Sequence, residues 1–134
     1  MTDAETRAFA KGFFDCIETG DVDGLVACYA ADAEIWHNTD GLVQRPADNR
    51  ATLTGLVRAF ADRTYDERRL DVFPGGFVQQ HVLRATRVRD GVKVALAACI
   101  VCRVADGKIT RLDEYFDSAK VAAFIGGRDP PISG

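Results

Sequence analysis

The second half of the chain contains four long stretches in which apolar and polar residues alternate, and this pattern most constrains the fold. Tight-turn signals separate the stretches: Pro-Gly-Gly at 74–76, then Asp-Gly at 90–91 and at 106–107. Asp-Gly favours a two-residue hairpin turn, because both residues tolerate positive φ angles. We therefore predict antiparallel strands over Tyr65–Phe73, Phe77–Arg89, Val92–Val104 and Lys108–Asp117.

The first half of the chain has a mainly helical pattern. An apolar stripe predicts a helix over residues 3–19, which Thr19 and Gly20 end. Asp21 is placed to cap a short second helix, with Leu25, Val26 and Tyr29 on its buried side. The other predicted elements are a strand over 33–38, a helix over Pro46–Arg63 and a short helix over Ser118–Ile125.

Helices followed by long strands predict an α+β fold, in which a curved, mostly antiparallel sheet wraps around N-terminal helices. A sheet shaped like a cone leaves an opening that can hold a ligand. With 134 residues, the chain is expected to form one domain over 1–134. We place its core at 3–125 and expect a loose Gly/Pro-rich tail over 126–134.

Charge and hydropathy limit the classes of partner. The net charge is −3, and lysines and arginines are scattered among acidic residues rather than gathered in a stripe. This argues against nucleic acid as a partner. The N-terminus lacks a signal-peptide pattern, and no apolar run approaches the ~18 residues of a membrane span. We therefore expect a cytoplasmic protein with no membrane partner.

The cysteines predict neither a disulfide framework nor a metal site. Cys16, Cys28, Cys99 and Cys102 all stand among apolar neighbours, as reduced core cysteines do. Cys99 and Cys102 have the CxxC spacing, but residues three apart on a strand point to opposite faces. No second pair of cysteines or histidines lies at ligand spacing, so we expect no metal.

The last predicted strand carries an acidic residue on its more apolar face. Thr110, Leu112, Glu114 and Phe116 share this face, and the opposite face is mostly polar. An unpaired buried carboxylate is costly and raises its own pKa. Glu114 therefore either has a partner on a neighbouring element or faces a pocket, and both alternatives indicate a site.

Two segments far apart in the sequence resemble the nuclear transport factor 2-like superfamily. They are the stretch from Glu18 to Ile35, which contains Gly-Asp-Val-Asp-Gly-Leu, and the stretch from Asp106 to Asp117. The nearest branches are the SnoaL-like polyketide cyclases, the ketosteroid isomerases and the limonene-epoxide hydrolases. The resemblance implies a cystatin-like conical fold, a single SnoaL-like domain, no cofactor and a homodimer formed through the sheet.

The comparison with ketosteroid isomerases leaves two of three catalytic roles unfilled. Those enzymes use an Asp base with a Tyr and a protonated Asp as hydrogen-bond donors. Here the Tyr position falls on Phe13, and the base position falls on His37. The acid position falls near Ala98–Ile100, where Cys99 is the one weakly polar residue. We therefore do not expect steroid isomerisation by that mechanism.

The comparison with limonene-epoxide hydrolases keeps one carboxylate and loses its partner. Glu114 stands at the catalytic carboxylate, and His37 matches the Asn that helps to hold the attacking water. The Arg and the second Asp of that family fall on Val82 and Arg84. Loss of the paired carboxylate removes the acid–base division that epoxide opening needs, so this activity is not expected in its usual form.

The strand over 77–89 offers two sets of polar candidates on opposite faces. His81 lies on one face with Gln79, and Gln80 lies on the other with Arg84. Alternation alone does not decide which face lines the pocket, and a bulge would reverse the answer. The hydrolase comparison favours Gln80 with Arg84, whereas proton chemistry favours His81.

The remaining candidate ligand contacts are Trp36, Asn38, Phe13, Cys99 and Leu112. Trp36 and Asn38 flank His37, so alternation puts them on the other strand face. There Trp36 is suited to packing or to a dimer surface, and Asn38 to a turn with Asp40.

Our leading hypothesis is a cofactor-independent isomerase or cyclase that acts on a small hydrophobic carbonyl compound. His37 would remove a proton beside the carbonyl, Glu114 would orient His37 or exchange the proton, and Gln80 or His81 would donate to the enolate oxygen. One alternative is a non-catalytic binding protein that uses the same pocket. Another is a hydrolase of epoxides or esters, with Glu114 as base and a water bound near it.

Overall fold

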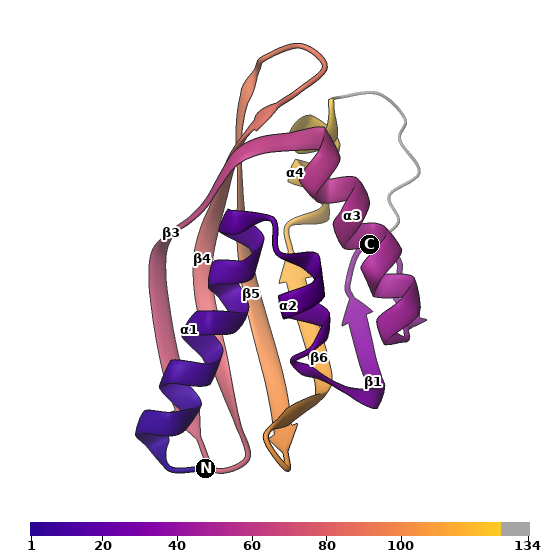
Figure 1. Cartoon of the computed structure of the whole chain (residues 1–134). Coiled ribbons are helices and arrows are strands. Elements are labelled where there is room, and N and C mark those ends of the chain that lie inside the picture. Colours follow the sequence, from indigo (N-terminus) through magenta and orange to yellow (C-terminus); the bar gives the residue numbers. More distant parts are fainter. Residues whose placement is uncertain (127–134) are drawn as a thin grey trace.

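The computed structural model describes residues 1–126 and shows helices packed on one side of a curved sheet (Figure 1). The sheet has six strands in the order β2-β1-β6-β5-β4-β3. Strands β1 and β6 pair in parallel, and every other neighbouring pair is antiparallel. The predicted α+β class with a curved sheet around N-terminal helices is confirmed. The residues expected to form the loose tail lie outside the described part of the chain from 127 onward.

The two N-terminal helices form as their end signals predict. Helix α1 spans Asp3–Thr19, and Thr2 caps it through a reciprocal pair of hydrogen bonds with Glu5. Gly20 ends the helix with φ = 76°, a left-handed conformation that favours glycine. Helix α2 spans Val22–Val26, and the side chain of Asp21 accepts a hydrogen bond from its first turn.

The long strands form three consecutive hairpins at the predicted positions, but the connection at Asp90-Gly91 spans residues 88–92 and is longer than the predicted two-residue turn. They are β3 (Phe60–Phe73), β4 (Gly76–Arg87), β5 (Lys93–Ala105) and β6 (Lys108–Phe116). Helix α4 then covers Ser118–Ile125, as predicted, and Asp117 caps it. Along the described chain, no helix is both long and apolar enough to cross a membrane.

Two predicted elements have wrong boundaries, and one strand was not predicted. Helix α3 spans Pro46–Ala59 and stops short of Arg63, because Phe60 and Ala61 already pair with β4. Strand β1 spans Tyr29–His37 and takes in Tyr29, which pairs with Ile109 and so does not continue α2. The short strand β2 (Val43–Gln44) was not predicted. In each case a long-range strand pairing decides the local structure.

A bulge in β6 changes which of its side chains are buried. Arg111 pairs with Arg103, whereas Ile109 pairs with Val104, so Thr110 is an extra residue. Beyond this point the alternation reverses. Ile109 is therefore fully buried on the same side as Leu112, which corrects the prediction that it lies on the polar face.

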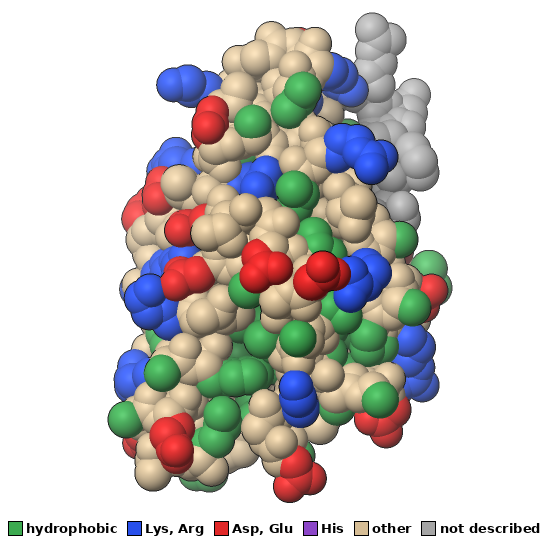
Figure 2. Space-filling view, viewed as in Figure 1, with side chains coloured by type: hydrophobic (Ala, Val, Ile, Leu, Met, Phe, Trp, Pro, Cys, Tyr) green, Lys and Arg blue, Asp and Glu red, His purple; other side chains and the backbone are tan. Residues whose placement is uncertain are grey.

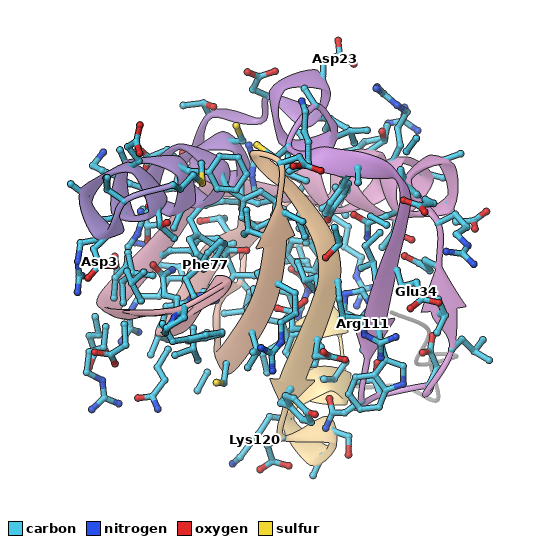
Figure 3. All side chains as sticks on the ribbon, turned by 90° about the horizontal axis from the view of Figure 1, so that it is seen from below. Asp3, Asp23, Glu34, Phe77, Arg111 and Lys120 are labelled. Atoms are coloured by element: carbon cyan, nitrogen blue, oxygen red, sulfur yellow. The ribbon has the colours of Figure 1, made fainter. Side chains whose placement is uncertain are left out.

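The core lies between the helices and the concave side of the sheet. Figure 3 shows Phe77 directed toward α1, whereas Glu34 and Arg111 lie on the opposite side of the sheet. The solvent side of the helices carries interspersed acids and bases, and no histidine is visible there (Figure 2). Both histidines, His37 and His81, are buried in the interior.

Candidate active site

A cavity of about 430 Å³ lies between the helices and the concave face of the sheet, which is within the usual size range of small-molecule sites. All four helices of the described chain and five strands contribute to its wall. The wall is mostly aliphatic and aromatic, and its apolar members include Phe13, Ile17, Leu25, Leu56, Leu83, Ile100 and Leu112. A few polar side chains interrupt this surface, and they determine what the cavity can do chemically.

His37 and Glu114 form a close pair in the cavity wall. His37 is the last residue of β1, and it pairs in register with Glu114 on the adjacent parallel strand β6. The imidazole Nε2 lies 3.1 Å from Glu114 Oε1. Both groups are largely shielded from water, and the ring of His37 stacks on that of Phe116. The pair is thus held by neighbouring backbones and by an aromatic face.

The carboxylate of Glu114 controls the charge of His37. Burial by itself lowers the pKa of the imidazole, but the hydrogen bond and charge of Glu114, with a further contribution from Asp40, outweigh burial. The net result is that the pKa of His37 is raised above its ordinary value. A carboxylate that accepts from Nε2–H also fixes the tautomer, so Nδ1 carries the basic lone pair of the neutral ring.

A second set of polar groups extends from β1 to α3. The hydroxyl of Tyr29 donates to Asn49 Oδ1 at 2.8 Å, Asn49 donates to Gln44 Oε1 at 3.1 Å, and Gln44 donates to Thr52 Oγ1 at 3.0 Å. Burial raises the pKa of Tyr29 well above its ordinary value. The polar groups of this series are hydrogen-bonded to one another, and the series joins the wall of the cavity to α3.

Two further polar groups of the cavity wall make no such bond. The hydroxyl of Thr39, just after His37, is buried and has no hydrogen-bond partner within the described chain. Tyr65, on β3, also lines the cavity, and its hydrogen bonds within residues 1–126 are made by its backbone N–H and carbonyl. Buried hydrogen-bonding groups usually have partners, so the Thr39 hydroxyl is a position where a ligand could supply one, and the Tyr65 hydroxyl is a second candidate.

The structure separates the two sets of polar candidates on β4. His81 faces inward and is 3% exposed; its ring stacks on that of Tyr65 at 4.0 Å between centroids. His81 is not among the residues that line the cavity. Gln80 and Arg84 are exposed on the outer face, where Arg84 pairs with Asp66 and Glu67. Gln80 and Arg84 therefore do not line the cavity, which corrects the prediction that they contact a ligand there.

Five other sequence candidates divide in a similar way. Phe13 and Leu112 line the cavity. Cys99 lies with Gln80 in a shallow hollow on the outer face, because it alternates with the buried Ile100. Trp36 also points outward and makes an edge contact with Tyr115. Cys99 and Trp36 are thus not placed as pocket contacts.

Asn38 has a structural role that differs from the predicted turn with Asp40. Its amide donates to the carbonyl of Phe116 at 2.9 Å, and its side-chain oxygen accepts from the Phe116 N–H at 3.0 Å. These bonds extend the ladder between β1 and β6 by one residue. Asn38 therefore steadies the end of the strand that carries His37, without itself lining the cavity.

Tyr65 is the main site residue that the sequence analysis missed. Simple alternation groups Tyr65 with Glu67 and Arg69, which are polar and exposed. In the structure, Asp66 pairs with Val82 but Arg69 pairs with Gln80, and Glu67 has φ = 56°. This bulge reverses the alternation. A tyrosine at the start of a long strand, next to a helix rich in apolar residues, is a weak signal that could have singled it out.

No cluster of three or more His, Cys, Asp or Glu side chains suited to a metal ion occurs within residues 1–126. Likewise, no lysine or arginine of the described chain lines the cavity. The charged groups of the wall are Glu114 and, when protonated, His37. The site therefore combines an acid–base pair with an otherwise neutral and mostly apolar surface.

Comparisons with known proteins identify the family. The model of the SnoaL-like domain matches residues 10–112. The uncharacterized protein Rv0034 of Mycobacterium tuberculosis is 32% identical over 132 residues, covering 92% of this chain and 98% of that protein.

Two solved structures share the fold at low identity. A putative polyketide cyclase from Xanthomonas campestris matches with a TM-score of 0.82 at 16% identity, covering 92% of this chain and 98% of its own. An epoxide hydrolase of M. tuberculosis, described as LEH-like, matches with a TM-score of 0.74 at 17% identity, covering 91% and 90%. The family model matches most of the chain, and the curved sheet is consistent with that match. The chain therefore belongs to the SnoaL-like family.

Proposed function

We propose that this protein is a cofactor-independent isomerase or cyclase that transfers a proton within a small, hydrophobic carbonyl compound. The observation that carries the proposal is the His37–Glu114 pair at 3.1 Å in the wall of an apolar cavity. A base beside a carboxylate, shielded from water, is the arrangement that general base catalysis requires. The polyketide cyclases among its structural neighbours agree with this chemistry but share only the fold.

The proton transfer follows from the polarity of the pair. Nδ1 of neutral His37 removes a proton from the carbon beside the carbonyl, and the electrons of the broken C–H bond move to the carbonyl oxygen. Glu114 stabilises the imidazolium that forms, because it already accepts from Nε2–H. Where a C=C bond is conjugated with the enolate, return of the proton to the far carbon of this dienolate shifts the double bond and completes an isomerisation. Attack of the enolate carbon on a second carbonyl, with the proton passing to the new alkoxide, completes a cyclisation.

The charge of the wall selects the class of ligand. Glu114 contributes a negative charge, and no lysine or arginine from the described chain is present to balance an anion. A carboxylate or phosphate group would be both desolvated and repelled. The remaining surface suits apolar carbon with few polar atoms. We therefore propose an uncharged ligand, with an oxygen that can accept a hydrogen bond.

The experiment is deuterium exchange beside the carbonyl of a neutral ketone. Alpha-tetralone is a suitable probe, because its exchange in D₂O can be followed by NMR without knowledge of the natural substrate. The protein should accelerate exchange, and His37→Gln should abolish the acceleration while keeping affinity for the probe. An unaccelerated rate with intact binding would instead indicate a non-catalytic binding protein.

We also propose that the protein forms a homodimer through the outer face of its sheet. Trp36 and Tyr115 make an edge contact on this face, and Tyr115 is 47% exposed. Ion pairs from Arg111 to Glu34 and Asp113 lie beside them on the same face. An apolar centre within a polar rim is the usual anatomy of an interface. Sedimentation equilibrium should give twice the chain mass, and a monomer mass would refute the proposal.

A further inference from the structure

Tyr65 combines features that suit it to bind a ligand oxygen. It lies on β3, across the cavity from the strands that carry His37 and Glu114. Tyr65 lines the cavity, and the hydrogen bonds that it makes within residues 1–126 use its backbone and leave its hydroxyl uncommitted. In contrast, the hydroxyl of Tyr29 is already committed to Asn49. Tyr65 therefore supplies the unused phenol of this cavity.

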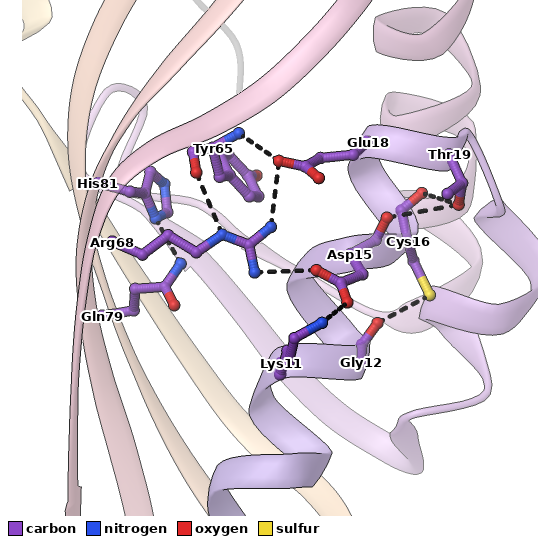
Figure 4. A network of polar contacts seen from close by, with 10 residues as sticks. All are labelled: Lys11, Gly12, Asp15, Cys16, Glu18, Thr19, Tyr65, Arg68, Gln79 and His81. Carbon is purple, nitrogen blue, oxygen red and sulfur yellow. Dashed lines mark hydrogen bonds and ion pairs between the residues drawn. The ribbon is translucent and has the colours of Figure 1, made fainter.

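The backbone of Tyr65 is fixed on both sides by a charged network (Figure 4). Its N–H donates to Glu18 Oε2 at 2.8 Å, and its carbonyl accepts from Arg68 Nε at 3.1 Å. Arg68 in turn pairs with Asp15 at 2.9 Å and with Glu18 at 3.2 Å. The bulge that turns Tyr65 inward is thus fastened to α1.

Two aromatic rings also pack against the ring of Tyr65. His81 stacks on it with centroids 4.0 Å apart, and Phe14 contacts it edge-on at 5.8 Å. Gln79 bonds to Nδ1 of His81 at 2.9 Å and so fixes the orientation of that ring (Figure 4). A side chain with a fixed backbone and a packed ring presents its hydroxyl in one direction before any ligand arrives.

We propose that the hydroxyl of Tyr65 is the donor that binds the carbonyl oxygen of the ligand and stabilises its enolate. The proposal rests on the proposed function, because it assigns the oxygen-binding half of the same site. Burial, together with the charge of Glu114, raises the pKa of Tyr65 far above its ordinary value, so the group stays protonated. It therefore donates a hydrogen bond but does not give up its proton.

This assignment also fixes how the ligand lies. The carbonyl oxygen is at Tyr65, and the carbon that loses its proton is directed toward His37. When His37 removes that proton, negative charge develops on the oxygen, and the bond from Tyr65 strengthens without further rearrangement. Phe13, at the position that carries the tyrosine of ketosteroid isomerases, has no hydroxyl. The donor thus comes from a different element in this protein.

Tyr65→Phe tests the proposal, because it removes the hydroxyl and keeps the ring. Infrared spectroscopy of bound alpha-tetralone should show a carbonyl stretch at lower frequency in the wild type than in Tyr65→Phe. The exchange rate at saturation should fall by about 10²–10³-fold, with little change in KM. Thr64→Val, which removes an exposed hydroxyl on the outer face of the same strand, should change neither quantity.

The outcomes separate this inference from the proposed function. A carbonyl band that is equal in wild type and Tyr65→Phe, or unshifted in both, overturns the role of Tyr65. If the band depends on Tyr65 but His37→Gln exchanges as fast as the wild type, the oxygen site stands and the proposed proton transfer is wrong. Circular dichroism and thermal unfolding of Tyr65→Phe verify that the comparison is made between folded proteins.

Discussion

His81 should make the stability of this protein depend on pH in a defined window. Burial lowers the pKa of its imidazole to about 4, opposed by the charge of Glu114 and assisted by that of Arg68. In the unfolded chain the same group has its ordinary value near ~6.5. Between these values the unfolded state binds a proton that the folded state excludes. Stability therefore rises with pH across this window, and it falls as the solution is acidified.

The size of the effect follows from the two pKa values. One pKa unit corresponds to ~1.4 kcal/mol, so the full gap is worth about 3 kcal/mol. At about pH 5 the loss from this residue should be about 2 kcal/mol. Small domains are stable by only about 5–15 kcal/mol, so the effect is a large fraction of the total. Because His81 is 3% exposed, solvent screening does not remove it.

Urea unfolding of the wild type and of His81→Phe at several pH values between about 4.5 and 7.5 measures this effect. Other titrating groups are common to both proteins and cancel in the difference. Loss of the hydrogen bond between Gln79 and the imidazole of His81 shifts the free energy of unfolding of His81→Phe by the same amount at every pH. The wild type should lose about 2 kcal/mol relative to the variant between neutral pH and about pH 5. If the free energies of unfolding of the two proteins changed in parallel with pH, the reasoning would be refuted.

Two further predictions concern the cavity itself. The exchange rate of alpha-tetralone should rise with pH through a transition above the ordinary imidazole value, because the neutral form of His37 is the base and its pKa is raised. Glu114→Gln should move that transition to lower pH and reduce the plateau rate, because burial then dominates and lowers the pKa of His37. A transition at an unchanged pH would show that Glu114 does not control the pKa of His37. Leu56→Trp should fill the cavity and weaken probe binding at least about tenfold, as measured by calorimetry. Leu42→Trp, at an exposed position, should leave the affinity unchanged. Equal affinities of Leu56→Trp and the wild type would show that the probe binds elsewhere.

Much of the fold and one part of the site could be predicted from the sequence. The turn at Asp106-Gly107, the cap at Asp21 and the stop at Gly20 all act locally. Their effect depends on the conformational preferences of a few adjacent residues. The face shared by His37 and Ile35 follows from simple alternation in a strand that, in this part, has no bulge.

The register between distant strands decided the rest. An extra residue at Thr110 puts Ile109 in the core, and the bulge after Asp66 turns Tyr65 toward the cavity. The partner that stabilises the second bulge is Arg68, which is held by acids of α1 far earlier in the chain.

The alternation of a strand has a period of two, so one inserted residue inverts every side chain that follows it. The energy that fixes such an insertion comes from contacts with other elements rather than from its own neighbours in sequence. The sequence by itself therefore determined which segments became helices and strands, and it determined that His37 and Glu114 were candidates for one site. Only the tertiary structure decided that Tyr65 faces them and that Gln80 and Arg84 do not.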